Sequence, residues 1–300
     1  MTGARAAAWK RMAAIGIVCA AFAALASGCS TTARVESYTL PVDPATTLLA
    51  VDVENVRGSV EVRTTAKDDA AHITAHLDAT YKHGGPDAEA VHADTRLDVT
   101  VEQAEGRGVV RVRAANPEAS SRHAIHLLIE VPRCDGVRIV NRGGTVEVVG
   151  ARGSAEITNY AGAIEVRSNH PVTEDIRLLN TDGPIFLQMA TGSTGAIDLA
   201  TLDGESVLRD FSGNADELIA SREALVTTLG DARNTILART NDGDVRVWVM
   251  ENPESLTRIV KSSMPDWRDY VFKEGSRRHT RNLPDDEPPR KRGTRANPGG

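Results

Sequence analysis

Aromatic residues are scarce in this sequence. Three Trp, four Tyr and four Phe make up only 4% of the 300 residues, whereas the apolar content as a whole is 41%. A core of this composition must be built from Val, Ile, Leu and Ala, which suits narrow, stacked β layers better than a bulky globular interior. The formal net charge of −6 also lacks the basic excess of nucleic-acid-binding proteins. We therefore expect a β-rich protein with no nucleic-acid partner.

Cysteines are too few for a disulfide framework. The chain has three, at positions 19, 29 and 134. Cys19 lies in an N-terminal leader and Cys29 is a candidate for lipid attachment, so Cys134 is left without a partner in an oxidising compartment. A single Cys of this kind is expected to be a small buried hydrophobe. Packing and backbone hydrogen bonds must therefore hold the fold.

The motifs of common catalytic sites are missing: the sequence has no G-x-S-x-G, P-loop, H-E-x-x-H or C-x-x-C. His72 and His76 are four residues apart, but their surroundings alternate as in a strand, so we expect no metal pair. Asp182, Asp203 and Asp242 precede glycines and fit turns better than the denser Gly-Gly-x-Gly-x-Asp repeat of calcium-binding β-rolls. Acidic residues are numerous enough to leave a glycosidase-like carboxylate pair open. Otherwise we expect no catalytic residue, metal site or cofactor.

Residues 1–28 have the organisation of a signal peptide. Positive charges at Arg5, Lys10 and Arg11 precede an apolar stretch from Met12 to Ala24 that is short for a membrane span. The following Leu-Ala-Ser-Gly-Cys sequence, which ends at Cys29, resembles the bacterial lipobox. This resemblance implies diacylation of Cys29 and cleavage on its amino side. The alternatives are an ordinary secretory signal beside a chance Cys and an uncleaved transmembrane anchor.

Lipidation at Cys29 would place the protein in the cell envelope, because two or more acyl chains hold a protein firmly to a membrane. The polar residues 29–37 would then form a flexible tether. Ser30 follows the Cys where Asp would signal inner-membrane retention, so the lipobox resemblance implies the outer membrane in a Gram-negative cell.

An internal repeat follows the leader and dominates the chain. Each copy has Asn or Thr, two further residues, an anchor Gly and then alternating apolar positions. The copies are NVRGSVEV (55–62), NRGGTVEV (141–148), NYAGAIEV (159–166), NTDGPIFL (180–187), TLDGESVL (201–208) and TNDGDVRV (240–247). The anchors are Gly58, Gly144, Gly162, Gly183, Gly204 and Gly243. From Gly144 the steps are 18, 21, 21 and 39 residues, and we interpret the last as two steps with a degenerate unit around Ser221–Leu229.

Fixed offsets from each anchor identify the elements as strands. Positions seven and five before the Gly, and two and four after it, are apolar around every anchor except Gly204, where Ser206 is the exception. The period is two, so the flanking segments are strands with inward Val, Ile, Leu and Ala, and outward residues such as Glu147 and Glu165 are expected in solvent. Stacked coils of about 20 residues would join the inward residues into one column. The anchor Gly would supply the positive φ of the turn.

With these repeats the chain resembles the bacterial putative-adhesin domain family of unknown function. The resemblance covers roughly Leu40 to Val249 and includes LLAVDVENVRGSVEV and IHLLIEVPRCDGVRIVNRGGTVEV. It implies a right-handed parallel β-helix, or solenoid. The family has no established activity, so the resemblance implies no functional residues.

The segments outside the regular repeats predict the remaining organisation. Residues 38–135 alternate less regularly, and we expect an irregular N-terminal β region whose longer coils or antiparallel sheet seal the end of the solenoid. Regular repeats fill 136–250. Leu256, Ile259 and Val260 have helical spacing, so 251–272 could form a helical cap, and the Arg- and Pro-rich residues 273–300 are expected to be a disordered basic tail.

These observations predict a non-enzymatic, lipid-anchored envelope protein whose β-solenoid binds a protein or glycan or acts as a scaffold. One alternative is a carbohydrate-active β-helix enzyme, which would need a deep groove lined by acidic residues. The second alternative is a self-assembling scaffold resembling bactofilins, although those are cytoplasmic polymers and this chain has an export leader.

Overall fold

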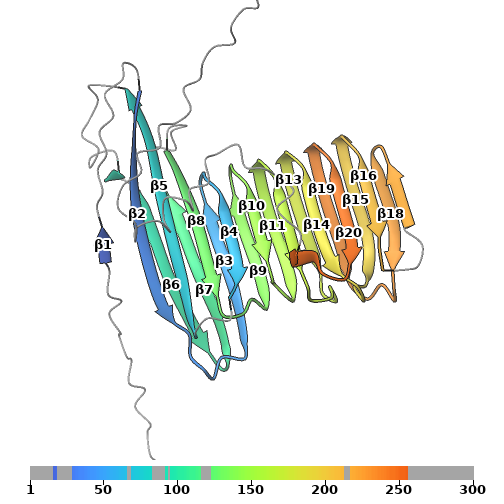
Figure 1. The fold of residues 1–300 in the computed structure, drawn as a ribbon, viewed down its shortest axis with the longest axis horizontal. Coiled ribbons are helices and arrows are strands. Elements are labelled where there is room, and N and C mark those ends of the chain that lie inside the picture. The colour runs from blue at the N-terminus through green and yellow to red at the C-terminus, as the bar shows by residue number, and fades with distance from the viewer. Residues whose placement is uncertain are drawn as a thin grey trace, which may run out of the picture. The chain divides into compact units, whose positions relative to one another are not determined.

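The computed structural model of the protein describes residues 16–18, 29–65, 69–82, 92–93, 95–115, 123–212 and 217–255. Within these ranges the chain is all-β, and its strands form two sheets that enclose one core (Figure 1). A short 3-10 helix, η1 (Pro253–Ser255), follows the last strand. No helix in these ranges is long and apolar enough to cross a membrane. The predicted tail at 273–300, most of the predicted leader and all but 251–255 of the predicted helical cap lie outside the described residues.

Sheet A contains eleven of the described strands. Their spatial order is β1 (Gly16–Val18), β2 (Cys29–Pro41), β5 (Ala70–Lys82), β8 (His123–Val131), β4 (Val60–Thr64), β10 (Val146–Val149), β12 (Ile164–Ser168), β14 (Ile185–Ala190), β20 (Val245–Met250), β16 (Ser206–Asp210) and β17 (Glu217–Ser221).

Sheet B contains nine of the described strands. Their spatial order is β18 (Ala224–Leu229), β15 (Gly195–Asp203), β19 (Thr235–Asp242), β13 (Ile176–Asp182), β11 (Ser154–Ala161), β9 (Gly136–Asn141), β3 (Leu48–Asn55), β7 (Arg107–Ala115) and β6 (Arg96–Ala104).

Each sequence repeat is one strand of sheet B, a turn at the anchor Gly and one strand of sheet A. The inward positions fall into register from repeat to repeat, because the strands pair in parallel at equal offsets from the anchors. The residues two positions after the anchors are all 0% exposed: Val60, Val146, Ile164, Ile185, Ser206 and Val245. Ser206 fits this column because its hydroxyl donates a hydrogen bond to the Glu223 carbonyl over 3.3 Å.

The core contains the residue types that the composition predicts. Its buried cluster consists of Val, Ile, Leu and Ala with Met189 and Cys134, and it includes no Phe or Trp among the described residues. Small aliphatic side chains fill the narrow space between the two sheets, and each layer continues the column of the layer before it.

The repeats do not stack in chain order at the C-terminal end. The β19/β20 repeat lies between β13/β14 and β15/β16, while β17 and β18 pair antiparallel with β16 and β15. The prediction of a degenerate repeat unit around Ser221–Leu229 is therefore wrong. These residues close the end of both sheets, and Val226 on the outermost strand is 79% exposed. A reversed pair of short strands ends the parallel stack without offering another parallel edge of the same kind.

The N-terminal end also contains antiparallel strands, which is one of the two arrangements that we considered for 38–135. Strand β5 pairs antiparallel with β8, and β6 pairs antiparallel with β7. Both sheets are consequently mixed. The structure confirms an all-β fold, but its two sheets are mixed and do not confirm the right-handed parallel β-helix that the family resemblance implied.

The segment 29–37 differs from its expected role as a flexible tether. It forms the first part of β2, which pairs with β5 from Cys29 opposite Lys82 to Pro41 opposite Ala70. Strand β1 pairs antiparallel with β2 and belongs to the leader that the predicted cleavage would remove. Tyr38 and Leu40, two residues apart on β2, pack against the core, so the strand extends along β5 instead of remaining a linker.

Candidate functional site

The six anchor glycines lie at the narrow turns between the sheets. Their φ angles are 118° (Gly58), 108° (Gly144), 101° (Gly162), 123° (Gly183), 155° (Gly204) and 111° (Gly243). A Cβ atom on Gly162 would lie 2.6 Å from the carbonyl oxygen of Gly144, so the close stacking of turns also requires glycine. These residues hold the fold and present no side chain to a ligand.

An amide ladder supports the same turns. The Nδ2 group of Asn180 donates hydrogen bonds to the carbonyls of Gly162 and Gly183, over 2.7 and 2.8 Å. Asn159 makes the equivalent bonds one layer away, and Thr240 donates to the Gly183 carbonyl over 2.9 Å. The Asn and Thr positions of the repeat are thus explained by turn structure.

The three aspartates before anchor glycines form an exposed row. Asp182, Asp242 and Asp203 occupy the same register position on β13, β19 and β15. Their backbone carbonyls accept the amides of Gly162, Gly183 and Gly243, each over 2.8 Å. The described residues contain no group of three or more His, Cys, Asp or Glu that could hold a metal ion. The row therefore has a structural explanation in the turns.

The outer face of sheet A carries a buried charged row that the sequence reasoning placed in solvent. Glu61, Glu147 and Glu165 occupy neighbouring strands in register, and only 2%, 1% and 0% of their surface is exposed. Arg167 forms ion pairs with Glu147 and Glu165, and Arg63 pairs with Glu61. The alternation correctly predicted the direction of these side chains, but outward in a sheet does not mean solvent-exposed.

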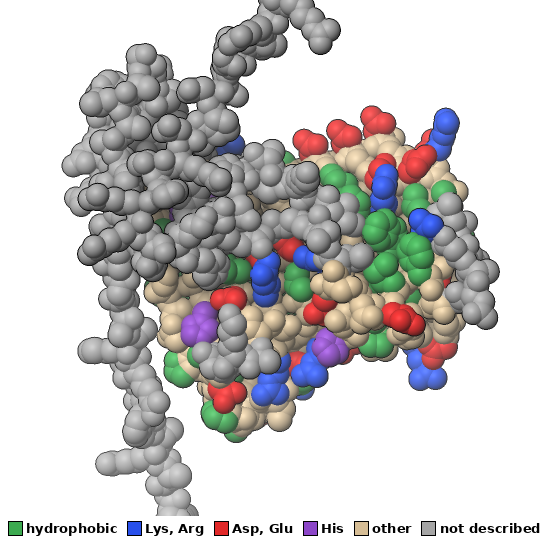
Figure 2. Space-filling model, in the orientation of Figure 1, with side chains coloured by type: hydrophobic (Ala, Val, Ile, Leu, Met, Phe, Trp, Pro, Cys, Tyr) green, Lys and Arg blue, Asp and Glu red, His purple; other side chains and the backbone are tan. Residues whose placement is uncertain are grey.

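The same face becomes aromatic toward its C-terminal end. Three adjacent strands, β14, β20 and β16 with the residue after it, place nine outward side chains in a block that we call the aromatic platform. Its members are Phe186, Gln188 and Ala190 from β14, Arg246, Trp248 and Met250 from β20, and Val207, Arg209 and Phe211 from β16 and its extension. Figure 2 shows hydrophobic and basic side chains gathered on this part of the surface.

Contacts within the aromatic platform hold its rings in place. Phe211 and Trp248 meet edge to face, with ring centroids 6.3 Å apart and an interplanar angle of 85°. The guanidinium carbon of Arg209 lies 4.5 Å from the Phe211 ring centroid, a cation–π arrangement. Phe211 is 37% exposed, and Arg246 is oriented by an ion pair of 2.6 Å to Asp244. On β14 the outward side chains are buried: Phe186, Gln188 and Ala190 are 8%, 1% and 3% exposed. On β20 and on β16 with its extension, aromatic and cationic side chains are at least partly exposed and held in fixed positions.

Sequence reasoning missed the aromatic platform, although a signal was present. Phe186 and Trp248 stand at outward positions of the repeat, where the other copies carry charged or small residues. In a chain with so few aromatics, two at such positions could have been noticed. Phe211 lies after the end of its repeat copy in the sequence. Only the pairing of the strands places it beside Trp248.

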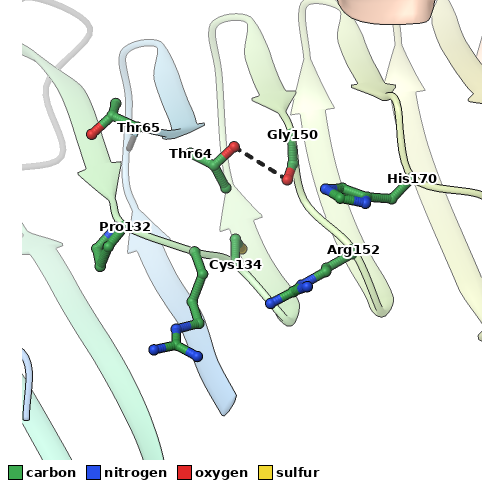
Figure 3. Close-up of a pocket in the computed structure, with 8 residues that line it drawn as sticks. Thr64, Thr65, Pro132, Cys134, Gly150, Arg152 and His170 are labelled. Carbon is green, nitrogen blue, oxygen red and sulfur yellow. Dashed lines mark hydrogen bonds between the residues drawn. The ribbon is translucent and has the colours of Figure 1, made fainter. Parts of the chain in front are cut away.

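A polar pocket lies at the opposite edge of the repeats from the anchor turns, where strands of sheet A return to sheet B (Figure 3). Its volume is about 330 Å³. The eight lining residues come from four successive connections: Thr64, Thr65, Pro132, Arg133, Cys134, Gly150, Arg152 and His170. None of them is acidic, so the pocket presents two guanidinium groups, an imidazole and two hydroxyls.

Histidines gather on the outer face of sheet A near its N-terminal end. His76 and His126 are register partners with ring centroids 6.4 Å apart, and His76 Nδ1 lies 3.0 Å from the Asp78 carboxylate. The Ser59 amide donates to His126 Nδ1 over 3.2 Å. Burial lowers the pKa of His126, an effect that Asp78 opposes and His76 reinforces. His72 lies on the same strand, β5, as His76.

The two cysteines beyond the leader differ in position. Cys134 is 1% exposed, its thiol lies 3.4 Å from the Gly136 carbonyl, and burial raises the pKa of this thiol to about 12. It is therefore neutral and protected from reaction at ordinary pH. Cys29 begins β2, and the structure describes its backbone pairing only. Lipidation of Cys29 remains a prediction.

Comparisons of the sequence with protein-family models and with curated proteins give no match. Among solved structures, a putative cell adhesion protein from Clostridium sporogenes aligns with 72% of this chain and 99% of its own, at 8% identity and a TM-score of 0.46. A putative adhesin from Bacteroides fragilis covers 72% of this chain and 97% of its own, at 9% identity and a TM-score of 0.24.

A putative adhesin from Parabacteroides merdae covers 71% of this chain and 80% of its own, at 8% identity and a TM-score of 0.25. At these levels of similarity no functional assignment follows from the three structures. The solved structures similar to this chain thus include proteins named putative adhesins.

Proposed function

We propose that this chain is a non-enzymatic, lipid-anchored protein of the cell envelope that binds an envelope glycan through the aromatic platform. The observation that carries the proposal is the arrangement of Trp248, Phe211 and Arg209 on the outer face of sheet A. Because the two rings are nearly perpendicular, one of them can present its face to the apolar C–H face of a sugar ring. The neighbouring guanidinium groups can donate hydrogen bonds to hydroxyl or carboxylate oxygens.

The dimensions of the aromatic platform favour a glycan over a folded protein partner. The exposed part of the platform lies on two strands, β20 and β16 with its extension, and at the usual strand spacing it measures about 10 by 13 Å, or roughly 130 Å². A stable protein–protein interface buries about 800 Å² on each partner. A surface of this size instead matches a short oligosaccharide segment.

The cationic groups favour an acidic glycan. Arg209 and Arg246 both belong to the platform, and Asp244 beside them pairs with Arg246 at 2.6 Å. Guanidinium groups beside exposed rings favour carboxylated or phosphorylated polymers over neutral ones, because their N–H donors form charge-assisted hydrogen bonds with oxyanions.

The envelope location and the lipid anchor rest on the leader and the lipobox-like sequence before Cys29. The non-enzymatic part rests on the burial of the clustered carboxylates: Glu147 and Glu165 are 1% and 0% exposed, so they offer no open pair to a sugar. A glycosidase needs two carboxylates that flank the scissile bond of a bound substrate.

Affinity electrophoresis of the detergent-solubilised full chain in gels containing acidic envelope polysaccharide tests this function. We expect retardation of the wild type, and loss of most of that retardation in Trp248→Ala and Phe211→Ala. Tyr160→Ala is the matched control, because Tyr160 is 52% exposed and lies outside the platform. Equal retardation of Trp248→Ala and the wild type would contradict the proposed site.

The non-enzymatic part has its own test. The same polysaccharides, incubated with the protein, should show no new reducing ends. Hydrolysis that Glu165→Gln abolishes would replace this proposal with the carbohydrate-active enzyme.

A further inference from the structure

The polar pocket at the wide turns points to a second binding function, separate from the aromatic platform. Its lining comes from the ends of β4, β8, β10 and β12, whereas the platform is built on β14, β20 and β16. Changes in one set of residues can therefore be tested without altering the other.

The pocket brings together basic groups that are far apart in the sequence. Arg133 belongs to the β8–β9 connection, Arg152 follows β10 and His170 follows β12. In Figure 3, the side chains of Arg152 and His170 both extend toward the space beside Gly150 and Cys134. Two guanidinium groups that line one pocket repel each other, and a bound anion removes this repulsion.

Both guanidinium groups are held by one nitrogen each. Arg152 donates from Nε to Asp135 Oδ1 over 2.7 Å, and Arg133 donates from Nη1 to the Thr47 carbonyl over 3.1 Å. Because Arg152 uses Nε, its two Nη nitrogens can address an oxyanion together. Anchoring of this kind reduces the loss of side-chain freedom when a ligand binds.

The walls of the pocket are fixed by backbone and hydroxyl hydrogen bonds. Thr65 N–H donates to the Val131 carbonyl over 2.8 Å, and Arg152 N–H donates to the Cys134 carbonyl over 2.8 Å. The Thr64 hydroxyl donates to the Gly150 carbonyl over 3.2 Å. The connections that line the pocket are therefore tied to one another before any ligand arrives.

The described lining residues carry basic but no acidic side chains. Asp135 lies behind them: its Oδ1 accepts Arg152 and its Oδ2 accepts the Leu49 amide over 2.8 Å. Cys134 lines the pocket as a neutral thiol, because burial raises its pKa to about 12. Arg133 donates to a backbone carbonyl, so Asp135 does not offset its charge.

We infer that this pocket binds a compact oxyanion, a phosphate group. The volume of about 330 Å³ lies at the small end of ligand sites, and the donors are those that recognise oxyanions: guanidinium, imidazole and hydroxyl. The source is either free inorganic phosphate or a phosphate ester, such as the headgroup of a phospholipid. The described lining residues include no Phe, Tyr or Trp, so the site is built to recognise the anion and not a base or a sugar face.

Isothermal titration calorimetry of the detergent-solubilised full chain tests the inference with two probes, inorganic phosphate and glycerol phosphate. Sodium chloride at matched ionic strength is the blank. We expect saturable binding of at least one probe, weakened about tenfold or more by Arg133→Gln and by Arg152→Gln, since each removes charge-assisted hydrogen bonds. Arg177→Gln on the exposed face of β13 is the control and should leave binding unchanged.

The two probes separate the sources. Tighter binding of glycerol phosphate identifies an ester ligand, and tighter binding of inorganic phosphate identifies the free ion. Arg133→Gln retains the Arg152–Asp135 ion pair, so it reports on binding even if Arg152→Gln lowers the thermal midpoint. Absence of saturable binding, or binding that both pocket variants retain in full, would overturn the inference. The polysaccharide retardation of the wild type and of Trp248→Ala does not depend on phosphate binding. The proposed function and this inference can therefore fail separately.

Discussion

Replacement of Arg167 by Met should be among the most damaging changes on the outer face of sheet A. The Arg167 side chain is 7% exposed and forms ion pairs with Glu147 and Glu165, whose side chains are 1% and 0% exposed. Removal of one partner from a buried ion pair typically costs about 3–5 kcal/mol, because the remaining charge stays in a low-dielectric environment. Methionine keeps most of the volume, so the loss would measure charge rather than packing.

Equilibrium urea unfolding, followed by circular dichroism, measures this loss. We expect the free energy of unfolding to fall by about 3–5 kcal/mol, which corresponds to about 6–20 °C in thermal midpoint for a domain of this size. Arg177→Met, on the exposed face of β13, is the control and should stay within about 0.5 kcal/mol.

A triple variant tests the electrostatic explanation. Arg167→Met combined with Glu147→Gln and Glu165→Gln should recover at least about half of the loss, since neutral amides need no buried cation. A loss below about 1 kcal/mol in the single variant would mean that the row behaves as a solvent-screened surface pair, and the burial on which the reasoning depends would be refuted.

Three further predictions concern the core, pH and the anchor. Ile164→Asp should cost more than about 4 kcal/mol, because Ile164 is 0% exposed in the stacked column; an unchanged thermal midpoint would disprove the register. The free energy of unfolding should fall as pH drops through about 6.5, because burial lowers the pKa of His126 in the folded protein and the unfolded chain then binds the proton more tightly. In His126→Phe the free energy of unfolding should depend less on pH. A pH dependence identical to that of the wild type would contradict this explanation. Cys29→Ser should release the protein from washed membranes without changing its circular dichroism spectrum, and equal release of the wild type would contradict lipidation.

The strand pattern was readable from the sequence because a two-residue period leaves a direct trace in the order of apolar residues. Val146, Ile164 and Ile185 stand two positions after their anchors, and the structure stacks them as predicted. Gly162 and its equivalents were readable for a similar reason, since a tight turn beneath another turn has no room for a Cβ atom.

The spatial order of the strands could not be predicted from the sequence in the same way. The β19/β20 repeat has the same local pattern as its neighbours, so its sequence does not specify which neighbours it joins. Its place between β13/β14 and β15/β16 depends on the antiparallel pairing of β17 and β18 with the preceding repeat. Pairing partners of equivalent strands are decided by the whole stack and not by a local segment.

The sequence by itself determined the all-β character, the inward columns and the turn glycines, because each depends on residues close together in the chain. Only the tertiary structure decided that Glu165 is buried, that Phe211 meets Trp248, and that Arg133 and Arg152 line one pocket. These are contacts between strands or turns from different repeats. Alternation tells which side of a sheet a residue faces, whereas its neighbours across the strands decide whether that side is dry, aromatic or charged.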